Sequence, residues 1–221
     1  MKRFPNESIE YRQARSRLLR AEVDLRKQIE QVARERRKLP MGGHIKEDYT
    51  FKSIIPDGVV KSVRLSELFS PGKGSLIIYS FMYGPQMEEP CPSCTSLIDG
   101  FNAVAPHTTQ RMNMVIVAKS PIERIMTFAR SRGWDRIRFL SSHQNTYNTD
   151  YWAESEDGSQ LPMVNVFVKR NSTFHHFWGS ELLFAEAEGD PRHVDLLWPL
   201  WNLLDLTPEG RGTNWNPKLS Y

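Results

Sequence analysis

The sequence has only two cysteines and no long hydrophobic run. Two cysteines in 221 residues exclude a domain held together by several disulfides, and they make a reducing, cytoplasmic location the expected one. No apolar stretch approaches the roughly 20 residues that cross a bilayer, and the mean hydropathy is −0.51, so we expect no membrane partner. The basic first residues lack an apolar centre, and we therefore expect no secretory signal.

Negative charge is scarce in the first 40 residues, which carry 12 Lys/Arg against 6 Asp/Glu, whereas the rest of the chain carries 17 against 20. A basic segment can contact nucleic acid or an anionic lipid surface. The six interleaved carboxylates instead favour a solvated helix surface, and no recognised nucleic-acid-binding motif accompanies the charge. We predict no nucleic-acid partner.

Glycine and proline are absent from Ser8 to Lys38, a run rich in good helix formers. Apolar or small residues recur there at a spacing of three and four: Tyr11, Ala14, Leu18, Ala21, Leu25 and Val32. This pattern predicts one long amphipathic helix, whose stripe packs either on the chain's own domain or against a second copy in a homodimer. Pro and Gly at 40–43 end the helix, so we divide the chain into an N-terminal helical arm, 1–40, and a domain, 41–221.

Short apolar segments alternate with helical patterns through the domain. We expect strands at 49–55, 59–64, 75–83, 112–118, 137–140, 163–169 and 173–178, with turns at 56–58 and 170–172. We expect helices at 66–69, from 91 to about 104, at 121–132 with Ser120 as N-cap and Gly133 as C-cap, and at about 192–204. This order predicts an α/β fold with a mixed central sheet and helices on both faces.

The two cysteines stand together as Cys91-Pro92-Ser93-Cys94, where a buried strand gives way to a helix. Two intervening residues allow the sulfurs to form a disulfide within one helical turn. Cys91 would lie at the helix N-terminus, where free N–H groups stabilise a thiolate, and Cys94 would lie one turn inside. Pro92 suits the first helical position. We predict that the Cys91 thiolate attacks a disulfide or a related oxidised sulfur of the substrate. Cys94 then resolves the mixed disulfide that this attack forms.

Two other roles for these cysteines fit less well. A structural disulfide would close a loop so small that its entropic gain is only about 2 kcal/mol. A structural zinc site needs four ligands, and no second C-x-x-C is present. No Gly-rich phosphate loop accompanies them either, so we expect no organic cofactor.

Several motifs resemble those of a thioredoxin-like family of predicted dithiol-disulfide oxidoreductases, long catalogued as a domain of unknown function. They are Met82–Pro85, Cys91–Cys94, Gly133–Trp134, Ser141–Ser142, Asn145, Asn148–Tyr151 and Leu203–Arg211, and the helix that ends in Arg37–Pro40. The resemblance covers nearly the whole chain. It implies a thioredoxin-like fold and a thiol-disulfide oxidoreductase activity that reduces or exchanges disulfides or a related oxidised sulfur. It also implies two partners: a disulfide-containing protein or small thiol substrate, and a cellular reductant.

A thioredoxin-like fold also implies a proline beside the dithiol, and Leu161-Pro162 directly precedes an apolar strand. A cis-Pro162 would present the Leu161 backbone to an extended substrate, which would place both residues, with Pro92, at a substrate-binding surface. The alternative is an ordinary trans proline that opens an edge strand.

The chain departs from better-known relatives just before Cys91. Peroxiredoxins carry Thr or Ser three positions before their reactive cysteine, and Pro four positions before that Thr or Ser. This chain has Glu88 and Gly84 at those two positions. Peroxidase chemistry is therefore not expected. The carboxylates of Glu88 and Glu89 should oppose the pull of the helix on the thiol, so we expect a Cys91 pKa above that of a typical thioredoxin nucleophile.

His175 and His176 lie on the last predicted strand and leave a metal-site alternative open. Thiolates and imidazole suit copper, so Cys91, Cys94 and one of these histidines could bind it. A hydrogen-bonded strand histidine is the simpler interpretation. A thioredoxin-shaped interaction domain without turnover is a further alternative.

Overall fold

The computed structural model describes residues 3–55, 57–186, 192–212 and 215–220. The chain separates into two compact units, Met1–Pro40 and Met41–Tyr221. The first unit is the helix α1 (Ile9–Lys38), which begins where Tyr11 N–H donates to the Ser8 hydroxyl, 3.1 Å away. Its 30 residues include none that is buried, so taken by itself the helix has no core. No helix among the described residues is long and apolar enough to span a membrane.

The second unit is built on one seven-stranded mixed sheet with the order β2-β1-β5-β4-β3-β6-β7. The strands are β1 (Thr50–Ile54), β2 (Val60–Arg64), β3 (Ser75–Phe81), β4 (Asn113–Ala118), β5 (Arg138–Ser141), β6 (Val164–Arg170) and β7 (Thr173–Gly179). β3, β4 and β5 are parallel neighbours, and the other pairs are antiparallel. The α/β thioredoxin-like fold with a long N-terminal helix is confirmed.

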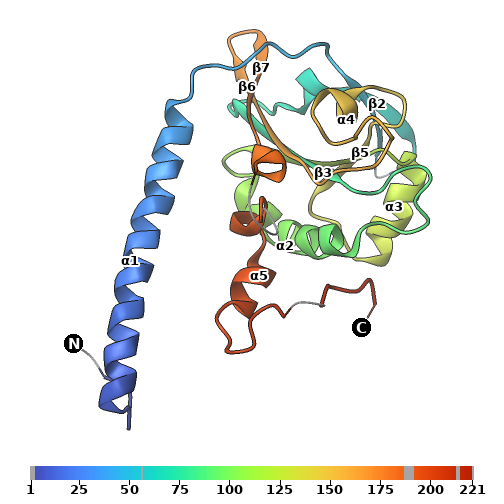
Figure 1. Cartoon of the computed structure of the whole chain (residues 1–221). Helices are drawn as coiled ribbons and strands as arrows, with labels where there is room; N and C mark the ends of the chain where they lie inside the picture. Colours follow the sequence, from blue (N-terminus) through green and yellow to red (C-terminus); the bar gives the residue numbers. More distant parts are fainter. Residues whose placement is uncertain (1–2, 56, 187–191, 213–214, 221) are drawn as a thin grey trace. The chain divides into compact units, whose positions relative to one another are not determined.

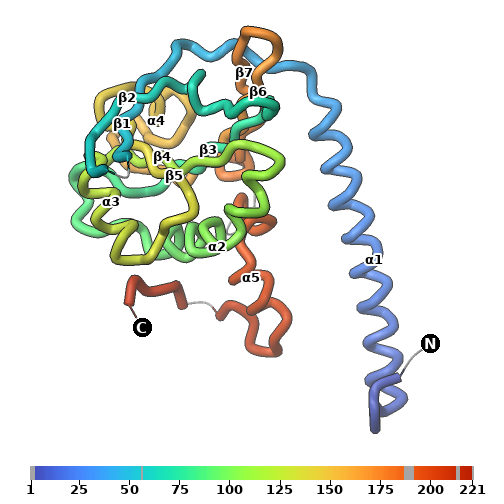
Figure 2. The backbone as a smooth tube through the Cα atoms, turned by 180° about the vertical axis from the view of Figure 1, so that it is seen from behind, coloured from blue at the N-terminus to red at the C-terminus, as the bar shows by residue number. Residues whose placement is uncertain are grey.

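Helices cover both faces of this sheet (Figure 1). On one face, α2 (Pro92–Thr108), α3 (Ile122–Ser131) and α5 (Pro199–Leu204) enclose a core that includes Tyr79, Phe81 and Ile116. Figure 2 shows α2 and α5 together on that side from behind. On the other face, the 3₁₀ turn Leu65–Leu68 and the short helix α4 (Tyr147–Asp150) cover Ile78 and Val117. The central strands are buried on both faces, which explains their continuous apolar runs.

Three predictions about local structure are wrong, and one element was missed. Gly133 is not the C-cap of α3: Arg132 holds that position, and Gly133 follows it with a φ of 69°. Ser120 is not the N-cap of α3: Pro121 holds that position, and the Ser120 hydroxyl donates to the Gly84 carbonyl, 2.9 Å away. The helix expected at 192–204 is broken into a 3₁₀ turn, Asp195–Leu197, and α5, because Pro199 lacks an N–H and disfavours helical backbone at Trp198. The polar stretch 141–160 contains α4, which we did not predict.

The turn expected at 56–58 lies partly outside the described residues, because Pro56 is not described. Gly58 is described and has a φ of 80°, a conformation that favours glycine, and its N–H donates to the Ile55 carbonyl at 2.9 Å.

A segment of extended chain runs along the outer side of β7. Ile45 N–H donates to the Phe174 carbonyl at 3.1 Å, and His176 N–H donates to the Gly43 carbonyl at 3.0 Å. His44 and His175 form the antiparallel bridge between these two bonds. The segment from Gly42 to Ile45 therefore continues the hydrogen bonding of the sheet beyond its last named strand.

Candidate dithiol site

Cys91 lies where the chain leaves the loop after β3 and enters α2. Its N–H donates to the Met82 carbonyl at 3.0 Å, which ties the loop to the end of the strand. Cys91 is the N-cap of α2, and its sulfur accepts from Cys94 N–H at 3.4 Å. Pro92 follows at the first helical position, where no N–H is required. The strand-to-helix junction therefore places the sulfur at a helix N-terminus.

The two thiols differ in their access to solvent. Both are free, but Cys91 is partly exposed, whereas Cys94 is only 3% exposed in the core between β3 and α2. An incoming sulfur can therefore reach Cys91 more readily than Cys94.

The acidity of the two thiols also differs. A hydrogen bond with the Cys94 thiol lowers the pKa of Cys91 to about 6, and the N–H groups of Cys94 and Ser93 add to this effect while burial opposes it. Burial raises the pKa of Cys94, and the neighbouring Cys91 sulfur raises it further. At neutral pH the pair therefore holds one thiolate, on the more exposed sulfur, and one thiol below it.

Our prediction that Glu88 and Glu89 would keep the Cys91 thiol less acidic is wrong. Both residues are exposed to solvent, which screens their charge, and neither contributes to the pKa of Cys91. The hydrogen bonds at the helix N-terminus set that pKa instead.

Sequence reasoning missed Arg124, on α3, which holds the loop that precedes the dithiol. Its guanidinium donates to the carbonyls of Pro85 at 3.2 Å and Glu88 at 2.6 Å, and also to that of Met87. The same group lies 4.6 Å from the centre of the Tyr83 ring. An Arg in the first turn of a helix gives no sequence signal for this role, because the loop that it binds is 36 to 39 residues away along the chain.

Tyr79, on β3, was also missed. It is fully buried, and its hydroxyl is hydrogen-bonded to the Cys94 thiol, an interaction that lowers the pKa of Cys94 while burial and the Cys91 sulfur raise it. The sequence shows Tyr79 only as one member of an apolar strand. Its position beside Cys94 depends on how β3 and α2 pack.

Leu161 and Pro162 lie in the chain that leads into β6. No peptide bond among the described residues is cis, so Pro162 is the ordinary trans proline that we considered as the alternative. Leu161 N–H donates to the Ala153 carbonyl at 2.9 Å, and the Pro162 carbonyl accepts from the ring of His193 at 3.1 Å. The carbonyl of the next residue, Met163, accepts from Ser80 N–H at 2.8 Å, so this segment joins β3 one residue beyond Tyr79.

His175 and His176 do not join the cysteines in a cluster. The ring of His175 lies against that of His44, tilted by 37° with the ring centroids 4.1 Å apart, and the ring of His176 is hydrogen-bonded to Asn165 at 2.9 Å. Within the described residues, no three His, Cys, Asp or Glu side chains are arranged to hold a metal ion. The proposed copper ligands therefore do not fit such a site.

Comparison with known proteins places the chain in a family and supports its fold. The model of a family described as "Bacterial protein of unknown function (DUF899)" matches residues 1–221. No curated protein matches.

Solved peroxiredoxin structures are similar in fold. A cysteine-to-serine mutant of Xylella fastidiosa PrxQ is 11% identical with a TM-score of 0.50, and the match covers 73% of this chain and 95% of that one. Peroxidoxin BcpB from Mycobacterium tuberculosis is 19% identical, with a TM-score of 0.46 and the same coverage. Thioredoxin peroxidase I from Plasmodium yoelii is 15% identical, with a TM-score of 0.48, over 81% of this chain and 100% of that one.

Proposed function

We propose that this chain, which belongs to the DUF899 family of bacterial proteins of unknown function, is a thiol-disulfide oxidoreductase whose redox-active pair is Cys91 and Cys94. The observation that carries the proposal is the asymmetry of the pair. The more exposed sulfur caps a helix and has a lowered pKa, whereas the buried sulfur has a raised pKa and lies within hydrogen-bonding distance of the first. Two thiols with a purely structural role would not need one accessible, acidic sulfur beside one buried, less acidic sulfur.

The reaction begins when the Cys91 thiolate attacks one sulfur of a substrate disulfide. A bond forms between Cys91 and that sulfur, the substrate S–S bond breaks, and the other substrate sulfur leaves as a thiolate. Cys94 then loses its proton to the leaving thiolate and attacks the Cys91 sulfur, which releases the second substrate thiolate; that thiolate takes a proton from water. The substrate gains two electrons, and the protein is left with a Cys91–Cys94 disulfide.

A cellular dithiol reductant returns the two electrons and completes the cycle. The hydroxyl of Tyr79 is bonded to Cys94 and stabilises its sulfur as the proton leaves. No organic cofactor or metal takes part in this scheme. The substrate class that the chemistry accepts is a disulfide, on a protein or on a small molecule.

Trapping of a mixed disulfide tests the proposal. The Cys94→Ser variant should form a stable adduct with an aromatic disulfide such as 5,5′-dithiobis(2-nitrobenzoate), because the attacking thiolate remains and the resolving thiol is gone. The Cys91→Ser variant should form little adduct, since its remaining thiol is buried. Intact-mass spectrometry measures both. Equal trapping by the two variants would overturn the assignment, and no adduct with Cys94→Ser would favour the non-catalytic interaction domain.

A further inference from the structure

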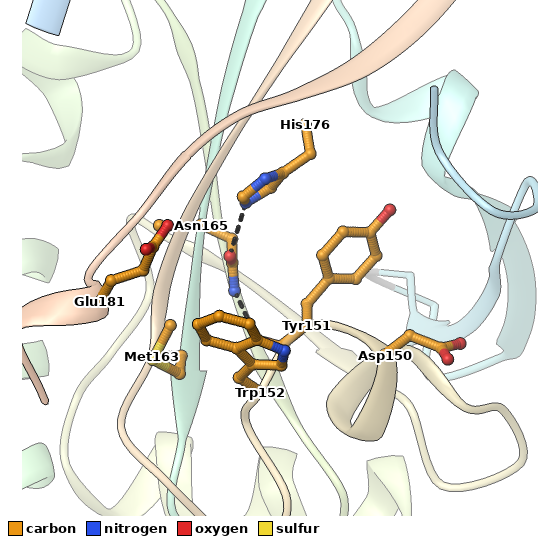
Figure 3. Close-up of a pocket in the computed structure, with 8 residues that line it drawn as sticks. Asp150, Tyr151, Trp152, Met163, Asn165, His176 and Glu181 are labelled. Atoms are coloured by element: carbon orange, nitrogen blue, oxygen red, sulfur yellow. Dashed lines mark hydrogen bonds between the residues drawn. The ribbon is translucent and has the colours of Figure 1, made fainter. Parts of the chain in front are cut away.

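A cavity of about 220 Å³ lies apart from the dithiol, on the sheet face that α4 covers. Its walls come from three separate segments: the end of α4 with the chain after it, the chain that enters β6 with the start of that strand, and β7 with the turn that follows (Figure 3). The lining residues with side chains are Asp150, Tyr151, Trp152, Met163, Asn165, His176 and Glu181. None of them is Lys or Arg, so the described lining offers a ligand no positive side chain.

Glu181 supplies a carboxylate that the protein leaves unused. It is exposed and makes no hydrogen bond or ion pair with another described residue. Asp150 differs, because Lys46 binds it at 2.6 Å and the Tyr49 hydroxyl donates to it at 2.9 Å. The free negative charge at the cavity is therefore that of Glu181.

Trp152 supplies an aromatic surface held in an uncommon backbone conformation. Its φ is 59°, which costs a non-glycine residue conformational energy, and such residues cluster at functional sites. Ala153 N–H donates to the carbonyl of the buried Asn148 at 2.7 Å, which fixes the chain on the far side of Trp152. The tryptophan nevertheless remains 52% exposed, and the ring of Phe184 packs against it edge-on, with the ring centres 5.4 Å apart. Burial of the indole itself therefore does not explain this backbone conformation.

His176 adds a neutral ring to the opposite wall. The Asn165 side chain donates its N–H to the Tyr151 carbonyl at 3.1 Å, so its oxygen faces His176 and accepts from Nε2 at 2.9 Å. Burial lowers the pKa of His176, although the nearby Glu181 carboxylate opposes this shift, so the neutral form of the ring predominates at neutral pH and Glu181 keeps its negative charge. Gly179 leaves room for this pair, because a Cβ there would lie 3.3 Å from the Asn165 oxygen.

We propose that this cavity binds a small planar nitrogen cation of the amidinium or guanidinium class. The Glu181 carboxylate would accept two N–H groups of the cation side by side, and the face of the Trp152 indole would cover its plane. Figure 3 shows Glu181, Met163 and Trp152 around the same space, with Asn165 and His176 along its upper side. The site is independent of the dithiol chemistry proposed above, because neither cysteine lines it.

Benzamidine and benzamide form a matched pair of ligands for the test, since they share a shape and differ in charge. Isothermal titration calorimetry of the full chain should show saturable binding of benzamidine, with benzamide about tenfold weaker or not detected because it lacks the charge-assisted hydrogen bonds. Glu181→Gln should weaken benzamidine binding about tenfold. Trp152→Leu should weaken it a few-fold, about the worth of an exposed cation–π contact.

Glu186→Gln is the matched control. Glu186 lies five residues after Glu181 but does not line the cavity, so the substitution removes a nearby carboxylate without changing the cavity. It should leave benzamidine binding unchanged, as should Cys91→Ser. The melting temperature of each variant, measured by circular dichroism, shows that it is folded. The proposal is overturned if benzamidine does not bind saturably, if benzamide binds equally well, or if Glu181→Gln behaves like Glu186→Gln.

Discussion

The acidity of a single thiol at this site depends on hydrogen bonds rather than on the charges nearest in sequence. The pKa of Cys91 is lowered by the Cys94 thiol and by the N–H groups of Cys94 and Ser93. Glu88 and Glu89 lie only three and two residues before Cys91 but are exposed to solvent. Distance along the chain was therefore a poor guide to electrostatic influence, because the direction of a side chain is fixed by tertiary structure.

The first prediction concerns the pH dependence of Cys91. Its folded pKa of about 6 is below the ordinary thiol value, so the thiolate is lost as the pH falls through about 6 and predominates at pH 7. The rate of iodoacetamide alkylation should rise with a midpoint near that pH, both in the wild type and in Glu88→Gln/Glu89→Gln. Cys94→Ala should move the midpoint to higher pH, because it removes the thiol whose hydrogen bond lowers the pKa of Cys91 most. A wild-type midpoint near the ordinary thiol value would contradict this.

The second prediction concerns Arg124, whose guanidinium donates to loop carbonyls that include those of Pro85, Met87 and Glu88. Arg124→Met leaves those carbonyls without their donor and should lower the free energy of unfolding by about 1–3 kcal/mol. Arg130→Met is the control, because Arg130 is exposed on the same helix. Urea denaturation of both variants measures the difference, and equal stabilities would show that the loop does not depend on Arg124.

The helix α1 exposes a stripe of apolar side chains that no described contact buries. Leu18, Leu25 and Val32 recur every seven residues and are all exposed, at 53%, 57% and 52%. Arg15 and Glu22 pair beside this stripe at 2.9 Å. A helix with such a stripe gains most of its stability from packing against another element.

We therefore expect the full chain to self-associate through α1. The double variant Leu18→Lys/Leu25→Lys should shift the sedimentation coefficient toward that of a monomer. Leu19→Lys/Val23→Lys adds the same two charges at exposed positions next to the stripe but outside the seven-residue spacing, so it should have no such effect. A wild-type chain that sediments as a monomer at all concentrations would contradict self-association.

Elements were predictable where burial leaves a simple pattern in the sequence. β3 and β4 were found within two residues of their ends, because strands buried on both faces are continuously apolar. α4 was missed because its turn buries Tyr147 together with Asn148, whose amide bonds to Ser142 and Gln160. A polar residue buried by hydrogen bonds has the same sequence signature as a polar residue in solvent.

At the scale of the whole molecule, the domain and the helix are separate units. A chain that begins at Met41 keeps both cores of the sheet, so its melting temperature should lie within a few degrees of that of the full chain. Circular dichroism at 222 nm should at the same time show the loss of one long helix. A truncated domain that fails to unfold cooperatively would show that α1 is required for the fold.

The two sites differ in how far the sequence could reveal them. The proposed dithiol lies within four residues, so its spacing alone was enough to predict Cys91 and Cys94 as the pair. The cavity draws Trp152, Asn165, His176 and Glu181 from segments that meet only when β6 and β7 pair with the rest of the sheet. No local pattern joins those residues, and so they could not be grouped before the fold was known.

The segment from Gly42 to Ile45 has a consequence for the behaviour of the protein at high concentration. An uncovered outer strand offers its free N–H and C=O groups to any extended chain, which is a common route to aggregation. On β7 the segment already occupies the groups that Phe174 and His176 would offer. It can come so close only because residue 42 is glycine, since a Cβ there would lie 2.1 Å from the His176 carbonyl oxygen. A substitution as small as Gly42→Ala would therefore push the segment away from β7 and make a well-folded domain prone to form intermolecular sheets.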